Sequence, residues 1–163
     1  MLDPDIFLSL GSNLGDRAEL LKLCRVQIDA HVGRILQTSS LYETAPWGNL
    51  AQPYYLNQVL RIETALEPLS LLAKILAIEN ELGRERQVRW EARTIDIDTL
   101  YLGSRVVSEP QLTVPHPRLA ERRFVLEPLV EISPSFVHPV LGKTNKELLD
   151  ACQDGLPVQL FKG

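Results

Sequence analysis

The chain has 163 residues, of which 45% are hydrophobic and 23% charged, and its formal net charge is −4. These values are typical of one globular domain with a sizeable core, and they argue against a disordered chain or a general nucleic-acid binder. The two cysteines, Cys24 and Cys152, lie far apart and form no Cys-x-x-Cys motif, so they do not favour a zinc site or a disulfide framework. No stretch has the character of a membrane span or a signal peptide. We therefore expect a cytoplasmic protein with no membrane partner.

The first predicted elements are a strand, a helix and a second strand. Residues 6–11 are mostly apolar and predict the first strand. Asp16, with a glutamate three residues later, predicts a capped helix that runs to about His31. The glycine-containing turn at 11–15 lacks the Gly-Lys-Ser/Thr ending of a phosphate loop, so we expect it to have no ligand role. A second strand is predicted from residue 34 to about residue 42.

A loop with proline and glycine follows at 43–53, and its Trp47 fits a core position as well as a ligand contact. The next strand is predicted over residues 54–65. Asn57 lies inside this strand, where asparagine is disfavoured. Its amide both donates and accepts, so it suits either recognition of a polar ring edge or a bond to backbone or water.

A helix is predicted from Pro68 to about Leu82, with Gly83 as the residue that ends it. Glu79 falls on the inner stripe of this helix by the i, i+3, i+4 rule. An inward carboxylate near a helix end either pairs with an arginine or contacts a ligand, and the sequence leaves both open. The apolar members of the stripe are Leu72, Ile75, Leu76 and Leu82.

The stretch 93–103 predicts a strand that carries two acids near its beginning. Side chains alternate along a strand, so Asp96 and Asp98 share one face, with backbones about 6.6 Å apart. This spacing suits oxygen ligands of two divalent cations, although two acids at the end of a strand also commonly point into water. The alternation places Leu100 and Leu102 on the acid face and Ile95, Ile97, Thr99 and Tyr101 on the other.

Two basic segments flank the acid-bearing strand. The first, 83–93, contains four arginines and a tryptophan. The planar guanidinium group of arginine can donate paired hydrogen bonds to phosphate oxygens. The second begins at His116, which stands between two prolines, and it continues with Arg118, Arg122, Arg123 and Phe124. Arginines beside a metal held by carboxylates are the components of a polyphosphate site. Taken alone, the second segment is more typical of a solvated loop.

The remaining stretches complete the expected architecture. Residues 105–107 suggest a short hairpin partner for the acid-bearing strand, 124–132 is mostly apolar and suits the core, and 143–152 suits a short helix. Strands and helices in this order predict a mixed α/β domain. Its simplest packing is a central, largely antiparallel sheet with helices on its faces.

Four motifs together resemble those of the 6-hydroxymethyl-7,8-dihydropterin pyrophosphokinase family of folate biosynthesis. They are LSLGSNLGD at 8–16, QPYYLN at 52–57, RTIDID at 93–98 and LTVPHPR at 112–118. The resemblance covers nearly the whole chain, so it implies one domain over residues 1–163. It also implies an α+β fold, a ferredoxin-like α/β sandwich.

The resemblance implies an ATP-dependent diphosphokinase that transfers the β,γ-pyrophosphoryl group of ATP to the pterin hydroxymethyl group and releases AMP. The site would use two Mg²⁺ ions, with Asp96 and Asp98 as their protein ligands. The implied catalytic residues are Arg84, Arg93, Asp96 and Asp98. The implied ATP-binding residues are Glu79, Arg84, Arg93, Ile97, His116 and Arg122. The implied pterin-binding residues are Thr44, Pro46, Trp47, Tyr55, Asn57, Asp96 and Phe124.

One departure from the family pattern lies in the first basic segment. The family commonly has Trp-Gly-Pro-Arg where this chain has Trp90-Glu91-Ala92-Arg93, and Gln87 stands in a region that is often more basic. We expect these changes to affect loop closure more than metal binding. Two other hypotheses fit the residues alone, namely a metal-dependent hydrolase or nucleotidyl transferase and a non-catalytic small-ligand or RNA-binding module. The acids on the strand disfavour the RNA-binding module. We expect a monomer whose partners are ATP and the pterin.

Overall fold

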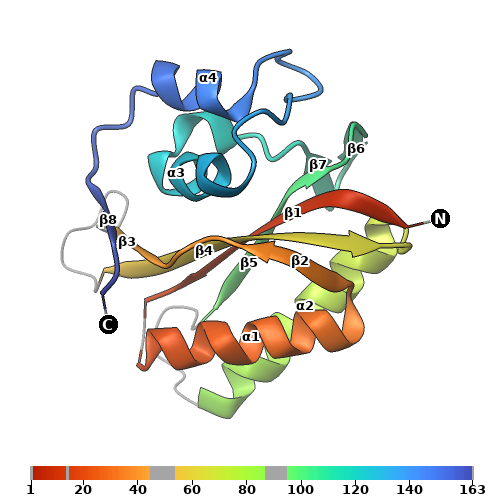
Figure 1. The fold of residues 1–163 in the computed structure, drawn as a ribbon. Helices are drawn as coiled ribbons and strands as arrows, with labels where there is room; N and C mark the ends of the chain where they lie inside the picture. The colour runs from red at the N-terminus through yellow and green to blue at the C-terminus, as the bar shows by residue number, and fades with distance from the viewer. Residues whose placement is uncertain (1, 14, 45–53, 87–94, 163) are drawn as a thin grey trace.

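The computed structural model describes residues 2–13, 15–44, 54–86 and 95–162, and within 84–86 it describes the main chain. Its centre is an antiparallel sheet with the strand order β5-β1-β4-β3-β8, in which β2 also pairs with β4 (Figure 1). The strands of this sheet are β1 Asp3–Ser12, β2 Arg34–Thr38, β3 Tyr42–Thr44, β4 Tyr55–Thr64, β5 Asp96–Leu102 and β8 Val158–Leu160.

Helices cover both faces of the sheet. On one side lie α1 Arg17–His31 and α2 Pro68–Arg86, and on the other lie α3 Arg123–Ile132 and α4 Asn145–Ala151 (Figure 1). A 3₁₀ turn, Leu119–Glu121, precedes α3. This arrangement confirms the predicted α+β sandwich of ferredoxin-like type with an antiparallel sheet. None of the described helices has the length and apolarity needed to cross a membrane.

The sheet separates two hydrophobic layers because side chains alternate along each strand. The layer toward α1 and α2 includes Leu8, Leu10, Leu60 and Ile75, all at most 1% exposed. The layer toward α3 and α4 includes Phe7, Val59, Tyr101, Leu126 and Leu129. The central strand β1 therefore contributes to both layers, and its buried side chains fix its position in the sheet.

The predicted alternation of side chains along β5 is wrong beyond Leu100, because the strand contains a β-bulge there. Leu8 of β1 lies opposite Thr99, whereas the preceding residue, Phe7, lies opposite Tyr101, so Leu100 is one extra residue on β5. An extra residue reverses the alternation beyond it. The sequence placed Tyr101 on the face of Ile95 and Ile97, but Tyr101 packs in the opposite layer against Phe7, with ring centroids 5.7 Å apart.

The predicted strand over 34–42 is interrupted, which is a second correction. Thr38 lies opposite Leu60 and Tyr42 lies opposite Asn57, so three residues face two on β4. Ser39 bridges the gap, since its hydroxyl accepts the Val59 N–H at 2.9 Å. β2 and β3 therefore follow one another along the same edge of β4.

The α2 helix differs from the prediction in its end and its buried stripe. It continues through Gly83 to Arg86, because glycine inside a helix costs only about 1 kcal/mol relative to alanine. Leu76 is 51% exposed, so the prediction that it lies on the inner stripe is wrong. Ile75 and Leu82 are buried as predicted and Leu72 packs against the core partly buried, whereas Leu71 and Ile78 are buried in addition.

The second half of the chain differs from the prediction in one further place. The segment predicted to pair with the acid-bearing strand instead contributes to β6, Val107–Glu109, which pairs with β7, Leu112–Val114. Gly103, with φ +58°, ends β5 and turns the chain away. The apolar stretch 124–132 contributes Val125, Leu126 and Leu129 to the core, as predicted, and it forms helix α3 with Pro128 inside it. The predicted short helix at 143–152 is confirmed as α4.

On the α3 side of the sheet, a buried hydrogen bond joins β5 to α4. The Tyr101 hydroxyl donates to Asn145 Oδ1 at 2.7 Å, and both residues are fully buried. The Asn145 amide in turn donates to the Ser133 carbonyl at 2.9 Å. This chain of bonds attaches α4 to β5.

We expect Tyr101→Phe to lower the free energy of unfolding by about 1–2 kcal/mol, because it leaves a buried acceptor of Asn145 unsatisfied. Chemical denaturation measures this change. Tyr54→Phe is the matched control, since the Tyr54 residue is 53% exposed and the same deletion there should change stability by less than about 0.5 kcal/mol. Equal effects of the two variants would contradict the assigned role of the hydrogen bond.

The loop before α4 is organised by a buried histidine. His138 Nδ1 accepts the main-chain N–H groups of Val140 and Leu141, at 3.1 Å and 3.0 Å. Its ring packs edge-on against Tyr101. Burial lowers the pKa of His138 below its ordinary value of 6.5, and a proton on Nδ1 would face two donors.

We expect His138 to make the fold less stable as the pH falls below 6.5. In this range the unfolded chain takes up the proton before the folded chain does, so protonation favours unfolding, whereas the stabilisation is complete above 6.5. His138→Asn keeps an acceptor for the same two N–H groups but cannot titrate. Its free energy of unfolding should therefore fall less between pH 7.5 and pH 5.5 than that of the wild type. Identical pH dependence of the two proteins would contradict this prediction.

Candidate active site

The candidate site is centred on Gly11, near the end of β1, the strand that lies between β5 and β4. Gly11 lies opposite Asn57 of β4 on one side and opposite Asp96 of β5 on the other. Neighbouring strands lie about 4.8 Å apart, so the backbones of Asn57 and Asp96 are about 10 Å apart across Gly11. A side chain at position 11 would occupy the space between them, since a Cβ there would come within 3.0 Å of Asn57 Oδ1.

A cavity of about 230 Å³ opens over this point on the α3 side of the sheet. Its walls combine carboxylates, an amide, hydroxyl groups, two aromatic rings and a guanidinium group. The lining residues are Ser9, Gly11, Thr44, Tyr55, Asn57, Asp96, Asp98, Arg122 and Phe124. Seven of the predicted site residues are therefore brought together from β3, β4, β5 and the segment that enters α3.

The two aspartates share the cavity face of β5, as the alternation predicted, because both precede the bulge at Leu100. The His116 segment is attached beside them through its main-chain N–H, which donates to the Leu100 carbonyl at 3.0 Å. His116 Nε2 thereby lies 4.0 Å from Asp98 Oδ1. The histidine is thus held at the free edge of β5, next to an acid of the cavity.

The protonation state of His116 follows from its surroundings. Its Nδ1 accepts the Arg118 N–H at 3.1 Å, so the neutral ring carries its proton on Nε2, toward Asp98. Burial lowers the pKa of His116, Asp98 partly opposes this, and Arg122 and Arg118 lower the pKa further. The result at neutral pH is an uncharged imidazole that offers one N–H donor beside the acid.

Asn57 and Thr44 form the polar end of the cavity. Asn57 is 3% exposed, and its Nδ2 donates to Thr44 Oγ1 at 2.8 Å. This bond fixes the orientation of the amide and leaves Oδ1 as an acceptor next to Gly11. The pair is suited to a ring edge that carries its own donors and acceptors.

Two rings from different elements complete the cavity. Tyr55 comes from the first residue of β4, and Phe124 comes from the first turn of α3. The Arg122 guanidinium lies 5.6 Å from the centroid of the Phe124 ring, within the range of a cation–π contact. Burial raises the pKa of Tyr55, and the Asp96 carboxylate adds to this effect. Tyr55 therefore remains a neutral aromatic surface.

Glu79 and Ile97 lie outside the lining of this cavity. Ile97 is 6% exposed and packs in the layer toward α1 and α2. Its main-chain N–H donates to Glu79 Oε2 at 2.7 Å. The inward orientation predicted for Glu79 is therefore present, and this carboxylate contacts the strand that carries the two aspartates.

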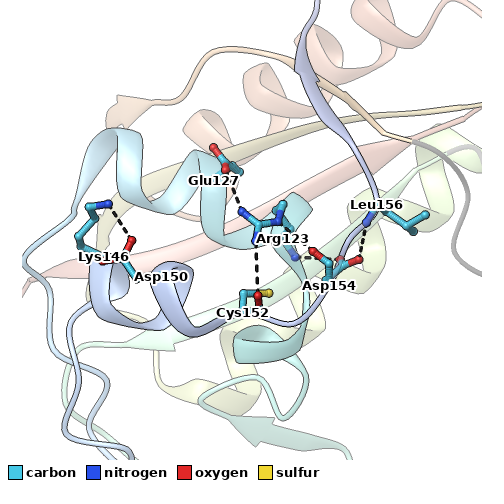
Figure 2. A network of polar contacts seen from close by, with 7 residues as sticks. All are labelled: Arg123, Glu127, Lys146, Asp150, Cys152, Asp154 and Leu156. Atoms are coloured by element: carbon cyan, nitrogen blue, oxygen red, sulfur yellow. Dashed lines mark hydrogen bonds and ion pairs between the residues drawn. The ribbon is translucent and has the colours of Figure 1, made fainter.

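The arginines of the second basic segment have different environments. Arg122 lines the cavity, whereas Arg123 faces the C-terminal segment (Figure 2). Arg123 Nε donates to the Asp154 carbonyl at 2.9 Å, and its main-chain N–H donates to the Asp154 carboxylate at 3.1 Å. Its guanidinium also pairs with Glu127 at 3.4 Å. Arg123 therefore holds the start of α3 in place.

Several predicted site residues lie outside the described part of the chain. These are Pro46, Trp47, Arg93 and the side chain of Arg84, together with the departures at 87–92. By contrast, Ser9 and Gly11 line the cavity although sequence reasoning assigned them no role. The available signal was the alternation in β1, which places Ser9 and Gly11 on the face of Phe7.

Comparison with known proteins identifies the family. A family described as 7,8-dihydro-6-hydroxymethylpterin-pyrophosphokinase (HPPK) matches residues 7–134. A protein of Bacillus subtilis named 2-amino-4-hydroxy-6-hydroxymethyldihydropteridine pyrophosphokinase is 45% identical over 127 residues, which are 77% of this chain and 76% of that protein. The protein of the same name from Methylorubrum extorquens is 43% identical over 88% of this chain and 90% of its own length.

Longer proteins also contain a matching region. The Pneumocystis carinii folic acid synthesis protein fol1 is 39% identical over 84% of this chain, which spans only 18% of that protein. Wild-type Plasmodium falciparum HPPK-DHPS shares the fold, with a TM-score of 0.70, 18% identity and coverage of 90% of this chain and 44% of that one.

These matches confirm the family and the enzyme class that the four motifs indicated. The family model covers most of the chain, and both bacterial relatives match it over most of their own length. The chain belongs to the 7,8-dihydro-6-hydroxymethylpterin-pyrophosphokinase family, the ATP-dependent enzymes of folate synthesis that transfer pyrophosphate to hydroxymethyldihydropterin.

Proposed function

We propose that this chain carries out the family reaction in the cavity over Gly11, with the pterin at the Asn57 end and the triphosphate of ATP at the Asp98 end. The observation that carries the assignment is the division of the cavity itself. Its β3 and β4 side offers an amide, a hydroxyl and an aromatic ring, whereas its β5 side offers two carboxylates. The first set suits a polar heterocycle, and the second suits metal-bound phosphate.

The pterin ring would lie between Tyr55 and Phe124, since both are neutral aromatic surfaces of the same cavity. Asn57 Oδ1 would accept from a ring N–H, because the amide nitrogen already donates to Thr44. Pro46 and Trp47 belong to this proposal through the family resemblance. The hydroxymethyl group would then point along the floor of the cavity toward Asp96.

Two Mg²⁺ ions fit the acids of β5. Magnesium is usually bound by one or two carboxylates, and phosphate oxygens and water fill its other positions. Among the described residues, no group of three His, Cys, Asp or Glu side chains is arranged to hold a metal. Asp96 and Asp98 are the proposed protein ligands because both carboxylates line the cavity, and ATP would complete the coordination. When bound there, Mg²⁺ supplies charge neutralisation for the triphosphate.

In the proposed reaction the substrate hydroxyl oxygen forms a bond to the β-phosphorus, and the bond from that phosphorus to the oxygen bridging the α-phosphate breaks. AMP leaves with the bridging oxygen, and the hydroxyl proton is released. The protein contributes mainly by holding the two substrates in line. His116 and Arg122 would contact the nucleotide, and Glu79, Arg84, Arg93 and Ile97 complete its proposed binding set.

We expect Asp96→Ala and Asp98→Ala each to lower turnover by about 100-fold or more, because each removes a proposed ligand to the ions that neutralise the transferring group. The assay measures AMP and pterin pyrophosphate, which should form in equal amounts in the wild type. Glu109→Ala, which removes an exposed acid on β6, is the control and should retain full activity. A near-normal rate in either aspartate variant, or ADP as the product, would rule out this assignment.

We expect Gly11→Ala to weaken pterin binding roughly tenfold, because its methyl group enters the cavity 3.0 Å from Asn57 Oδ1 and 3.7 Å from Tyr55 Cδ1. Binding of a non-hydrolysable ATP analogue should change by less than about twofold if the ends of the cavity are assigned correctly. Calorimetric titration measures both affinities. Gly155→Ala is the control, since a Cβ there meets no described atom within 4 Å. Equal weakening for both ligands would contradict the division of the cavity.

A further inference from the structure

Arg17, the first residue of α1, connects three segments that are distant in the sequence. Its Nη1 lies 2.7 Å from Glu43 Oε2 and donates to the Tyr54 carbonyl at 2.9 Å. Its guanidinium carbon lies 5.4 Å from the centroid of the Phe161 ring. One side chain thus contacts β3, the residue that precedes β4, and the C-terminal segment after β8.

The two polar partners of Arg17 are the immediate neighbours of cavity residues. Glu43 precedes Thr44, and Tyr54 precedes Tyr55. Thr44 and Tyr55 lie opposite one another and form the last pair of the β3–β4 ladder. Because side chains alternate along a strand, Glu43 points away from the cavity while Thr44 points into it. Arg17 therefore acts on the opposite side of the sheet from the cavity and does not line it.

The contact differs from an ordinary surface ion pair, which holds two flexible side chains and contributes little. The Arg17 side chain is only 22% exposed, and one of its partners is the main-chain carbonyl of Tyr54. Because a carbonyl is part of the backbone, this contact holds the backbone itself rather than a flexible side chain. The Phe161 ring contacts the guanidinium, and Phe161 is itself attached through its N–H to the Leu41 carbonyl at 2.9 Å. These contacts fix the separation between the ends of two strands.

We propose that Arg17 is a positioning residue for the pterin end of the cavity. By holding Glu43 and the Tyr54 carbonyl together, it sets the spacing of Thr44 and Tyr55. Thr44 in turn fixes the orientation of the Asn57 amide through the 2.8 Å hydrogen bond between them. The inference rests on the proposed function, which places the pterin against these residues.

The test compares ligand affinities in the full-length protein. Arg17→Ala should raise the dissociation constant of 6-hydroxymethyl-7,8-dihydropterin, measured with a non-hydrolysable ATP analogue and Mg²⁺, by roughly fivefold or more. The affinity for the ATP analogue should stay within about twofold. Arg17→Lys keeps the charge near Glu43 and should restore part of the pterin affinity. The double variant Arg17→Ala/Glu43→Ala should bind the pterin no more weakly than Arg17→Ala, because both residues act through one contact.

Two further variants separate the possible outcomes. Arg34→Ala removes an ion pair that is more exposed and remote from the cavity, since Arg34 Nε lies 2.8 Å from Glu63 Oε1 at the far end of β4, and it should leave pterin affinity unchanged. Asn57→Ala tests the pterin assignment itself. If Asn57→Ala weakens pterin binding and Arg17→Ala does not, the role of Arg17 is refuted while the proposed function stands. If neither variant weakens pterin binding, the role of Arg17 and the proposed pterin site are both wrong. Equal effects of the Arg17 and Arg34 variants, following a loss of thermal stability, would also refute the inference.

Discussion

The site depends on the pairing of β1 with a strand on each of its edges. This pairing places Gly11 between Asn57 and Asp96, so the groups proposed to recognise the pterin ring and the groups proposed to bind metal meet across a single residue. The strand spacing sets the distance between them, and the missing side chain of Gly11 leaves the space that a ligand needs. The buried residues of both layers hold β1 in this register, since a slip by one residue would exchange its two faces.

Residues close in sequence were predicted well wherever one element determined their arrangement. Asp96 and Asp98 share a face because alternation alone decides it, and Asp16 caps α1 because the capping bond to the Glu19 N–H is local. Tyr101 was placed on the wrong face because the bulge at Leu100 arises from the pairing of β5 with β1. This pairing cannot be predicted from the sequence of β5 alone. Leu76 was placed in the core because several helix phases fit a leucine-rich sequence.

Among the site residues, too, prediction failed where contacts between distant segments determine the position of a side chain. Arg122 and Arg123 are adjacent and chemically identical, yet one lines the cavity and the other binds Asp154, which is 31 residues further along the chain. No local signal distinguishes them, because α3 begins between them and its start is fixed by that distant carboxylate. Ser9 and Gly11 were missed for a related reason. Their role depends on which strands lie beside β1, and this is a property of the whole sheet.

β5, the strand that carries the acids, lies at the border of the main sheet, where unpaired main-chain groups would be open to another molecule. The Ile97 N–H is occupied by Glu79, and the Leu100 carbonyl is occupied by the His116 N–H. Exposed strand borders promote association between chains, and occupied ones resist it. The bonds that attach Glu79 and the His116 segment to β5 thus also occupy main-chain groups of this border, so the contacts that shape the proposed site leave fewer groups open to pairing with another chain.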